Sequence, residues 1–295
     1  MILVDKNKGI LYMLLASLAF AMMGLFVKRL GKDFGTVEIV FFRNLTGVTF
    51  ILLSFFKSPF SLKGEKPYLL LFRGFVGTVS LYAFAYNLTH VSLGEAFTYY
   101  QTSTLFIAAF SFLVLKEKMN RSAWIGLLLG FLGILVVFRP DIGANWKNNV
   151  MGITNGVLSA AAYLAVSELK KHYDTRAIVF TFMSWGIVLP VCSMIAGEFY
   201  EIPSLDFMIA TFKMPSSYHF LDIILVGLTA LLGQIYATRA FGIEKAGIAA
   251  AISYSNVVFS ILIGILIGDK FPDALTLLGM AMIVSSGLMI SLLRK

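Results

Sequence analysis

Long apolar segments separated by short polar connections run along the whole chain. Uncharged stretches at residues 96–115, 177–197, 247–268 and 274–293 each exceed the roughly 18 residues that span the hydrocarbon core of a bilayer. Charged residues and Gly or Pro breaks delimit the other apolar segments in the same way. The pattern predicts ten transmembrane helices, at residues 10–28, 36–56, 68–89, 93–115, 122–138, 150–168, 177–197, 220–239, 246–268 and 274–293.

The composition supports an all-α integral membrane protein. Hydrophobic residues make up 58% of the 295 residues and charged residues 14%, whereas soluble domains have about 45–50% and about 25%. The first segment follows Lys6 and Lys8, but no small-residue cleavage site precedes Lys28, so we expect a membrane helix rather than a signal peptide. The net charge is +8, and the basic residues that produce it lie mostly in short loops. This distribution is typical of topology signals and not of a nucleic-acid-binding surface.

The distribution of lysine and arginine predicts the orientation. Ten crossings place both termini on one side, and the loops of that side carry more than twice as many of these residues as the opposite loops. Basic loops stay in the cytoplasm. We therefore expect a multi-pass protein of the cell (inner) membrane with both termini cytoplasmic.

The two halves of the chain resemble each other. Gly9, Leu15 and Lys28 of the first helix recur, with the same spacing, as Gly152, Leu158 and Lys171. Helices four and nine both end in an acid followed by lysine. Five crossings end on the opposite side of the membrane, so the second half would enter the membrane from the side opposite to the first. Residues 1–145 and 146–295 would therefore form two inverted five-helix repeats, an arrangement typical of carriers. The alternative is that apolar helices resemble one another by composition alone.

Several segments resemble the EamA-type drug/metabolite transporter superfamily. They are Leu71-Phe72-Arg73-Gly74 with Gly77, Tyr82 to Tyr86, Leu93-Gly94-Glu95-Ala96, Thr102 to Phe106, Leu115 to Lys118 and Gly126 to Pro140. The resemblance implies a ten-helix carrier with cytosolic termini and a central cavity lined mainly by helices one, three, four, six, eight and nine. Family members commonly have proline near the middle of helices four and nine, where this chain has Thr104 and Asn256; kinks there would require polar side-chain bonding or glycine.

Charged residues inside the predicted helices are candidate binding groups, because an ionisable side chain in a bilayer requires a cavity or a partner. Arg43 in helix two is suited to bind a carboxylate or phosphate, or else forms a structural ion pair or extends to the surface. Glu95, at the start of helix four, is suited to bind an amine or a coupling proton, or to pair with Arg43 as an outer gate. Arg73 lies near the cytosolic end of helix three and is expected to extend to that surface.

Polar and aromatic residues complete the predicted pocket. Glu95, Tyr99, Thr102, Ser103 and Phe106 follow helical spacing and would form one cavity-facing stripe, with Ser255 and Asn256 at the positions of helix nine equivalent to Thr102 and Ser103. Each aromatic residue alone is more often a packing residue. The full set of predicted substrate-binding residues is Arg43, Tyr82, Tyr86, Glu95, Tyr99, Thr102, Ser103, Tyr163, Trp185, Gln234, Tyr236, Ser255 and Asn256.

The sequence contains no phosphate-binding loop, Cys/His cluster or hydrolase elbow, so we expect no cofactor, metal site or enzymatic activity. The single cysteine, Cys192, is expected to be a small buried hydrophobe. One chain with two repeats can enclose a cavity, so a monomer would suffice.

The resulting prediction is a secondary transporter that moves a small polar metabolite by alternating access. An amino acid or amino-acid-like compound would suit Arg43 and Glu95 together. Nucleotide-derived solutes such as S-adenosylmethionine, organic acids and sugars are alternatives, as is multidrug export; a membrane enzyme or a channel represents a different class. Direction of transport and coupling are open.

Reporter tags test the topology. We expect tags fused at the N-terminus and at the C-terminus to be shielded from membrane-impermeant reagents in intact cells, because the basic loops hold both ends in the cytoplasm. Labelling of only one terminus would contradict an even number of crossings.

Overall fold

The computed structural model describes residues 8–57, 64–90, 93–114, 116, 120–138, 146–200, 205, 207–266 and 273–292, and the regular structure in these ranges is helical. The first half contains α2 (Lys8–Leu30), α3 (Thr36–Lys57), α4 (Pro67–His90), α5 (Leu93–Leu113) and α6 (Arg121–Phe138). The second half contains α7 (Trp146–Leu169), α8 (Thr175–Gly197), a 3-10 turn η2 (Ser217–His219), α9 (Phe220–Ile243), α10 (Ala246–Ile252), α11 (Ser255–Leu266) and α12 (Ala274–Leu292).

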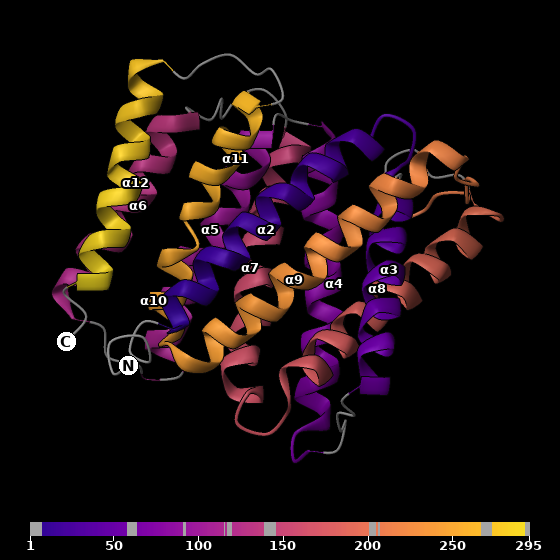
Figure 1. Ribbon diagram of the computed structural model, residues 1–295, viewed down its shortest axis with the longest axis horizontal. Helices are drawn as coiled ribbons and strands as arrows, with labels where there is room; N and C mark the ends of the chain where they lie inside the picture. Colours follow the sequence, from indigo (N-terminus) through magenta and orange to yellow (C-terminus); the bar gives the residue numbers. More distant parts are fainter. Residues whose placement is uncertain are drawn as a thin grey trace.

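The ten predicted helices are confirmed when α10 and α11 are counted as one interrupted crossing. Seven spans of the described chain are long and apolar enough to cross a membrane, and α5, α6 and α12 complete the set. The largest boundary differences from the prediction are four residues: α7 begins four residues earlier and α9 ends four residues later. Helix α2 begins and α12 ends on the same side of the bundle (Figure 1), which we call the terminal face.

The helix contacts follow a pseudo-twofold pattern. Helix α2 packs along α9, and its counterpart α7 packs along α4. In the same way, α3 contacts α9 while α8 contacts α4, and α5 contacts α7 while α11 contacts α2. Helices α3 and α8 pair with each other, and so do α6 and α12, at opposite edges of the bundle in Figure 1. Each contact is thus matched by the contact between the equivalent helices, as two inverted repeats require.

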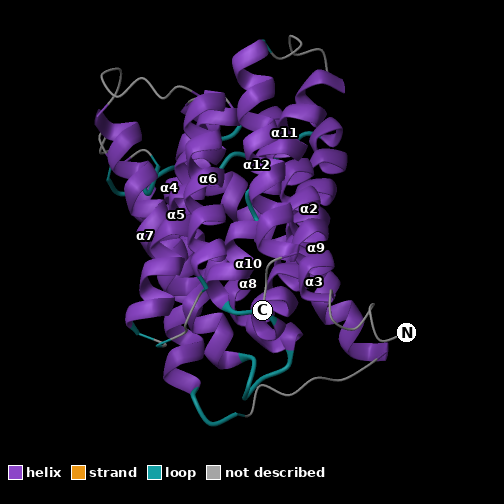
Figure 2. Ribbon diagram, turned by 90° about the vertical axis from the view of Figure 1, so that its left-hand side faces the viewer, coloured by secondary structure: helices purple, strands orange, loops and turns teal. Residues whose placement is uncertain are grey.

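The helices lie roughly side by side (Figure 2), and many large apolar side chains are exposed on their outer surface. On α8, the large side chains of Val188, Val191 and Ile195 are exposed, as expected for a surface that contacts lipid. Cys192 is also exposed, so its predicted burial is wrong. Because a thiol behaves as a small hydrophobe, a lipid-facing position accommodates it equally well.

Helix nine is not continuous, contrary to the prediction. It ends at Ile252 and resumes at Ser255. Ser253 Oγ donates to the Ala250 carbonyl at 2.6 Å and Ser255 Oγ to the Ile252 carbonyl at 2.9 Å, which is the polar side-chain bonding that interrupts helices without proline.

Two α5 side chains bind the backbone carbonyls at this break. Gln101 Nε2 donates to the Ser253 carbonyl at 2.8 Å, and Thr104 Oγ1 donates to the Ala250 carbonyl at 3.3 Å. Irregular backbone at membrane depth requires such partners, because lipid supplies none. The interrupted helix of the second repeat is therefore held by polar groups of the first.

This arrangement predicts that Gln101→Leu destabilises the protein by about 0.5–1.5 kcal/mol, because it removes one hydrogen bond to the Ser253 carbonyl and leaves the Asn256 backbone N–H as its donor. Thermal unfolding of the purified protein in detergent measures the change. Thr49→Val is the matched control, since exposed Thr49 bonds only within its own helix and its loss should change stability little. Equal effects of the two substitutions would contradict the role assigned to Gln101.

Candidate functional site

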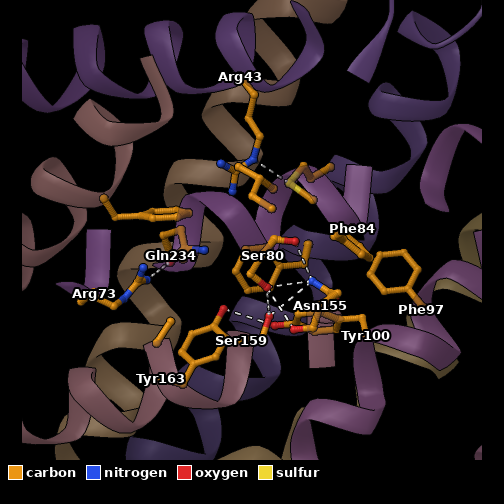
Figure 3. Close-up of a pocket in the computed structure, with 16 residues that line it drawn as sticks. Arg43, Arg73, Ser80, Phe84, Phe97, Tyr100, Asn155, Ser159, Tyr163 and Gln234 are labelled. Atoms are coloured by element: carbon orange, nitrogen blue, oxygen red, sulfur yellow. Dashed lines mark hydrogen bonds between the residues drawn. The ribbon is translucent and has the colours of Figure 1, made fainter. Parts of the chain in front are cut away.

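A cavity of about 50 Å³ lies between the two repeats. It is smaller than the roughly 300–1,000 Å³ of typical small-molecule sites, so a bound metabolite would require it to widen. Seven helices line it: α2, α3, α4 and α5 of the first half, and α7, α8 and α9 of the second. The family resemblance implied six lining helices. Five of them line the cavity, but the sixth, α10–α11, does not. Helices α3 and α8, which the resemblance did not include, also line it. The lining residues are Phe20, Met23, Arg43, Arg73, Gly77, Ser80, Leu81, Phe84, Phe97, Tyr100, Asn155, Ser159, Ala162, Tyr163, Phe182 and Gln234 (Figure 3).

Arg43 extends from α3 into this cavity and is 2% exposed. Its Nε donates to Met23 Sδ at 3.3 Å, and its Nη1 donates to Asn44 Oδ1 at 2.9 Å. Both acceptors are neutral. Within the described residues, they orient the guanidinium without neutralising its positive charge.

Arg73 also lines the cavity and is 2% exposed, so its predicted extension to the cytosolic surface is wrong. The physical reason is Gly77, one turn further into α4. A Cβ placed on Gly77 would lie 2.4 Å from Arg73 Nη1. The absence of that atom lets the guanidinium run inward along α4, where Nη2 donates to Gln234 Oε1 at 3.1 Å.

A polar cluster of Ser80, Asn155 and Ser159 joins α4 to α7 within the cavity wall. Asn155 Nδ2 donates to the Ser80 carbonyl at 2.9 Å, and the Ser80 and Ser159 hydroxyls lie 2.8 Å apart. Asn155 Oδ1 is buried and has no hydrogen-bond partner in the described structure. The cluster therefore presents an acceptor in the same cavity as the two arginines (Figure 3).

Aromatic side chains separate this cavity from a smaller one closer to the terminal face. Phe20, Tyr100 and Tyr163, which we call the aromatic layer, line both cavities. Tyr100 donates from its hydroxyl to that of Tyr163 at 3.2 Å, so the layer is bonded across the two repeats. The smaller cavity also contains Ser103 and Asn256.

Polar contacts join the two repeats at both faces of the bundle. On the terminal face, Glu168 of α7 pairs with Lys66, which precedes α4. On the opposite face, Arg29 Nε lies 3.1 Å from Asp222 Oδ2, and His219 Nε2 lies 3.2 Å from Asp33 Oδ2. The central cavity thus lies between two sets of contacts that must separate if either face is to open.

Three of the sequence-predicted site residues, Arg43, Tyr163 and Gln234, line the central cavity. The structure places Tyr82, Tyr86, Trp185 and Tyr236 elsewhere. Tyr82 bonds Ser193 of α8 at 3.1 Å, and Tyr86 stacks on His90. Trp185 packs against Phe75 and Tyr236 stacks on Tyr12, so these four rings make helix-packing contacts.

The predicted polar and aromatic stripe of α5 packs against α7. A Cβ on Gly152 would meet the Tyr99 ring, and a Cβ on Gly156 would meet Thr102 Oγ1. The two glycines form a groove that admits these side chains, as small residues four apart commonly do between membrane helices. Tyr99 also bonds Asn149. The side chain of Glu95 lies outside the described residues.

The equivalent polar pairs of helices four and nine are divided between three locations. Ser103 and Asn256 meet in the smaller cavity, and Thr102 lies against α7. Ser255 lines an apolar pocket formed with α2 and α12. Their matching sequence positions therefore do not create one shared surface.

The prediction missed Arg73, Ser80, Asn155 and Ser159 as cavity residues. A signal was present in their spacing. Asn155, Ser159 and Tyr163 recur every fourth residue on one face of α7, and Arg73 and Ser80 are seven residues apart on one face of α4. A polar stripe in an otherwise apolar membrane helix indicates a protected surface.

Comparison with known proteins gives concordant matches. Residues 7–139 match the EamA-like transporter family. The chain is 34% identical to an uncharacterized transporter of Helicobacter pylori, over 96% of this chain and 94% of that protein. It is 31% identical to the pseudopaline exporter of Pseudomonas aeruginosa over the full length of both.

The fold matches a solved structure as well. A crystal structure with 16% sequence identity superimposes with a TM-score of 0.77 and covers 97% of each chain. The full-length matches include both repeats and the helices that form the central cavity. The chain therefore belongs to the EamA-like transporters of the drug/metabolite transporter superfamily.

Proposed function

We propose that this protein is a secondary transporter of the bacterial cytoplasmic membrane that moves a small, amino-acid-like metabolite by alternating access. The terminal face would lie in the cytoplasm, as the basic loops predict. The pseudopaline exporter to which the chain is similar supports a small metabolite as substrate. A monomer suffices, because the cavity is enclosed by the two repeats of one chain.

The observation that carries this proposal is the buried charge of Arg43. A guanidinium taken out of water is costly unless it is paired, and its partners in the described structure, Met23 and Asn44, are neutral. A substrate carboxylate would supply the missing charge through the bidentate geometry that arginine favours. We infer that the anionic end of the substrate binds at Arg43.

The substrate amine has a separate acceptor in the cavity. Asn155 Oδ1 is buried without a partner, and an ammonium or amine N–H would satisfy it. Phe84 and Phe97 provide an apolar wall beside it. A solute with a carboxylate, an amine and some apolar surface would therefore satisfy the cavity better than a sugar would.

The contact layers support alternating access. Opening the terminal face would require separation of Lys66 from Glu168 and of Tyr100 from Tyr163. Opening the opposite face would require separation of Arg29 from Asp222. Because each contact joins the two repeats, a rocking motion of one repeat against the other would break one set while keeping the other.

Glu95 remains a proposed coupling group or amine ligand. Uptake into liposomes measured with and without a pH gradient separates these roles. Uptake that is independent of the gradient would remove Glu95 as a proton-coupling group.

Arg43, which has only neutral partners among the described residues, disfavours a multidrug exporter of lipophilic cations, because it would repel such substrates. S-adenosylmethionine carries both an amino-acid end and a positive charge, and it remains the alternative substrate among nucleotide-derived solutes.

Substitution of Arg43 tests the anion site. We expect Arg43→Gln to lower uptake of a transported amino acid by liposome-reconstituted protein at least about 30-fold, since loss of a buried charged partner costs about 2 kcal/mol or more. Arg43→Lys should restore part of the activity, because lysine keeps the positive charge but lacks the planar, bidentate N–H donors of the guanidinium. Arg121→Gln, at an exposed residue, is the control and should transport normally. Full activity of Arg43→Gln would exclude Arg43 from binding.

Gly77 provides an independent test of the cavity geometry. Gly77→Ala should reduce transport, because the added Cβ would lie 2.4 Å from Arg73 Nη1 and displace the guanidinium. Gly35→Ala is the control, since its added Cβ would make an ordinary contact at 3.5 Å. Uptake by both variants, normalised to folded protein from size-exclusion chromatography, measures the effect. Unchanged uptake by Gly77→Ala would mean that the position of Arg73 is not important for transport.

A further inference from the structure

The central cavity contains a second buried cation that the proposed carboxylate at Arg43 does not neutralise. Arg73 bonds the neutral amide of Gln234 through Nη2. Its Nε and Nη1 are buried and have no hydrogen-bond partner in the described structure. Arginine does not lose its proton in proteins, so this side chain has both an unpaired charge and unused donors.

The two guanidinium groups are close neighbours. Arg43 Cζ lies 5.7 Å from the centroid of the Phe182 ring, and Arg73 Cζ lies 4.3 Å from the same centroid. The carbons therefore cannot be farther apart than the sum of these distances. Figure 3 shows the two side chains entering the cavity from different sides. The ring attracts both cations but does not cancel their charge.

Three acidic side chains of the described structure have partners outside the central cavity. Glu38 accepts from the backbone N–H groups of Gly35 and Lys213, at 2.8 and 2.6 Å. Asp222 pairs with Arg29, and Glu168 pairs with Lys66. The residues that line the central cavity include two arginines and no aspartate or glutamate. Within the described part of the chain, the cavity is thus lined by two like charges with no acidic partner.

We propose that the transported solute carries two acidic groups, one for each arginine, and that dicarboxylates are the substrate class. This inference rests on the proposed transport function and restricts its substrate. One carboxylate would leave one buried guanidinium unpaired in a medium of low dielectric. Two carboxylates, each accepting from one planar fork, would satisfy the charges and the unused donors of Arg73. An amine on the same molecule would still be accepted by Asn155.

Matched pairs of probes that differ by one acidic group test this proposal. Purified protein in detergent is titrated with L-glutamate and L-glutamine, and with glutarate and its half-amide, and ligand-induced thermal stabilisation gives the affinities. We expect the diacids to bind about tenfold or more tightly than their half-amides, because each half-amide forfeits one charge-assisted pair. Equal affinity within both pairs, or no stabilisation by any of the four probes, would overturn the proposal.

Substitutions assign the two acidic groups. Arg43→Gln and Arg73→Gln should each lower the affinity for glutarate to about that of its half-amide, while Arg121→Gln should leave it unchanged. Loss of discrimination in only one variant would mean that the second arginine does not bind an acidic group. Inorganic phosphate that competes as strongly as glutarate would indicate one phosphoryl group bound by both arginines and would overturn the assignment of two separate carboxylates.

Glu95→Gln distinguishes a permanent ion pair from a substrate contact. If Glu95 neutralised Arg43, its removal would strengthen the binding of glutarate, and a monocarboxylate would then be the natural partner of the wild-type cavity. Unchanged discrimination between glutarate and its half-amide in this variant is the result that we expect.

Transport is measured separately, with radiolabelled L-glutamate and L-glutamine in liposomes. Diacid-selective binding without uptake in either direction would contradict the carrier proposal while supporting the two-acid site. Saturable transport that favours L-glutamine would support the carrier proposal and contradict the two-acid site.

Discussion

The cost of holding two guanidinium charges inside a membrane constrains the whole arrangement. Arg43 and Arg73 are each 2% exposed and lie on helices of the first repeat, but their surroundings include Phe182 and Gln234 of the second. Neither charge is tolerable against lipid. The two repeats must therefore meet around these residues, and the central cavity is the place where they do so.

The same constraint applies to the backbone. Every carbonyl at membrane depth needs a donor, and two carbonyls at the interruption between α10 and α11 accept from Gln101 and Thr104 of α5 in addition to their backbone donors. The pseudo-twofold packing of the bundle is thus locally asymmetric: α5 is continuous and supplies the side chains, whereas its counterpart is interrupted and receives them. The interrupted helix lies next to the aromatic layer, so its irregular backbone lies beside a contact that would break if the terminal face opened.

The cavity, the aromatic layer and the contacts of the two faces form one system. Arginines from α3 and α4 face acceptors and rings from α7, α8 and α9, so a solute with its acidic groups at the arginines and an amine at Asn155 would contact both repeats. A ligand held in this way couples the repeats through its own polar groups. Binding energy and the relative position of the two repeats are then linked, which is the physical requirement for a carrier rather than for an open pore.

The sequence by itself determined the ten crossings and the inverted repeats, because span length and the odd number of helices in each half are properties of hydrophobic pattern. It also identified Arg43 as an intramembrane charge. Only the tertiary structure decided which side chains share the cavity. Arg73 turns inward because Gly77 leaves space for its guanidinium. Tyr99 and Thr102 lie in a groove formed by Gly152 and Gly156 and not in the cavity. Helical spacing places residues on a face, but the absence of a Cβ on the same helix or on a neighbouring helix decides what that face contacts.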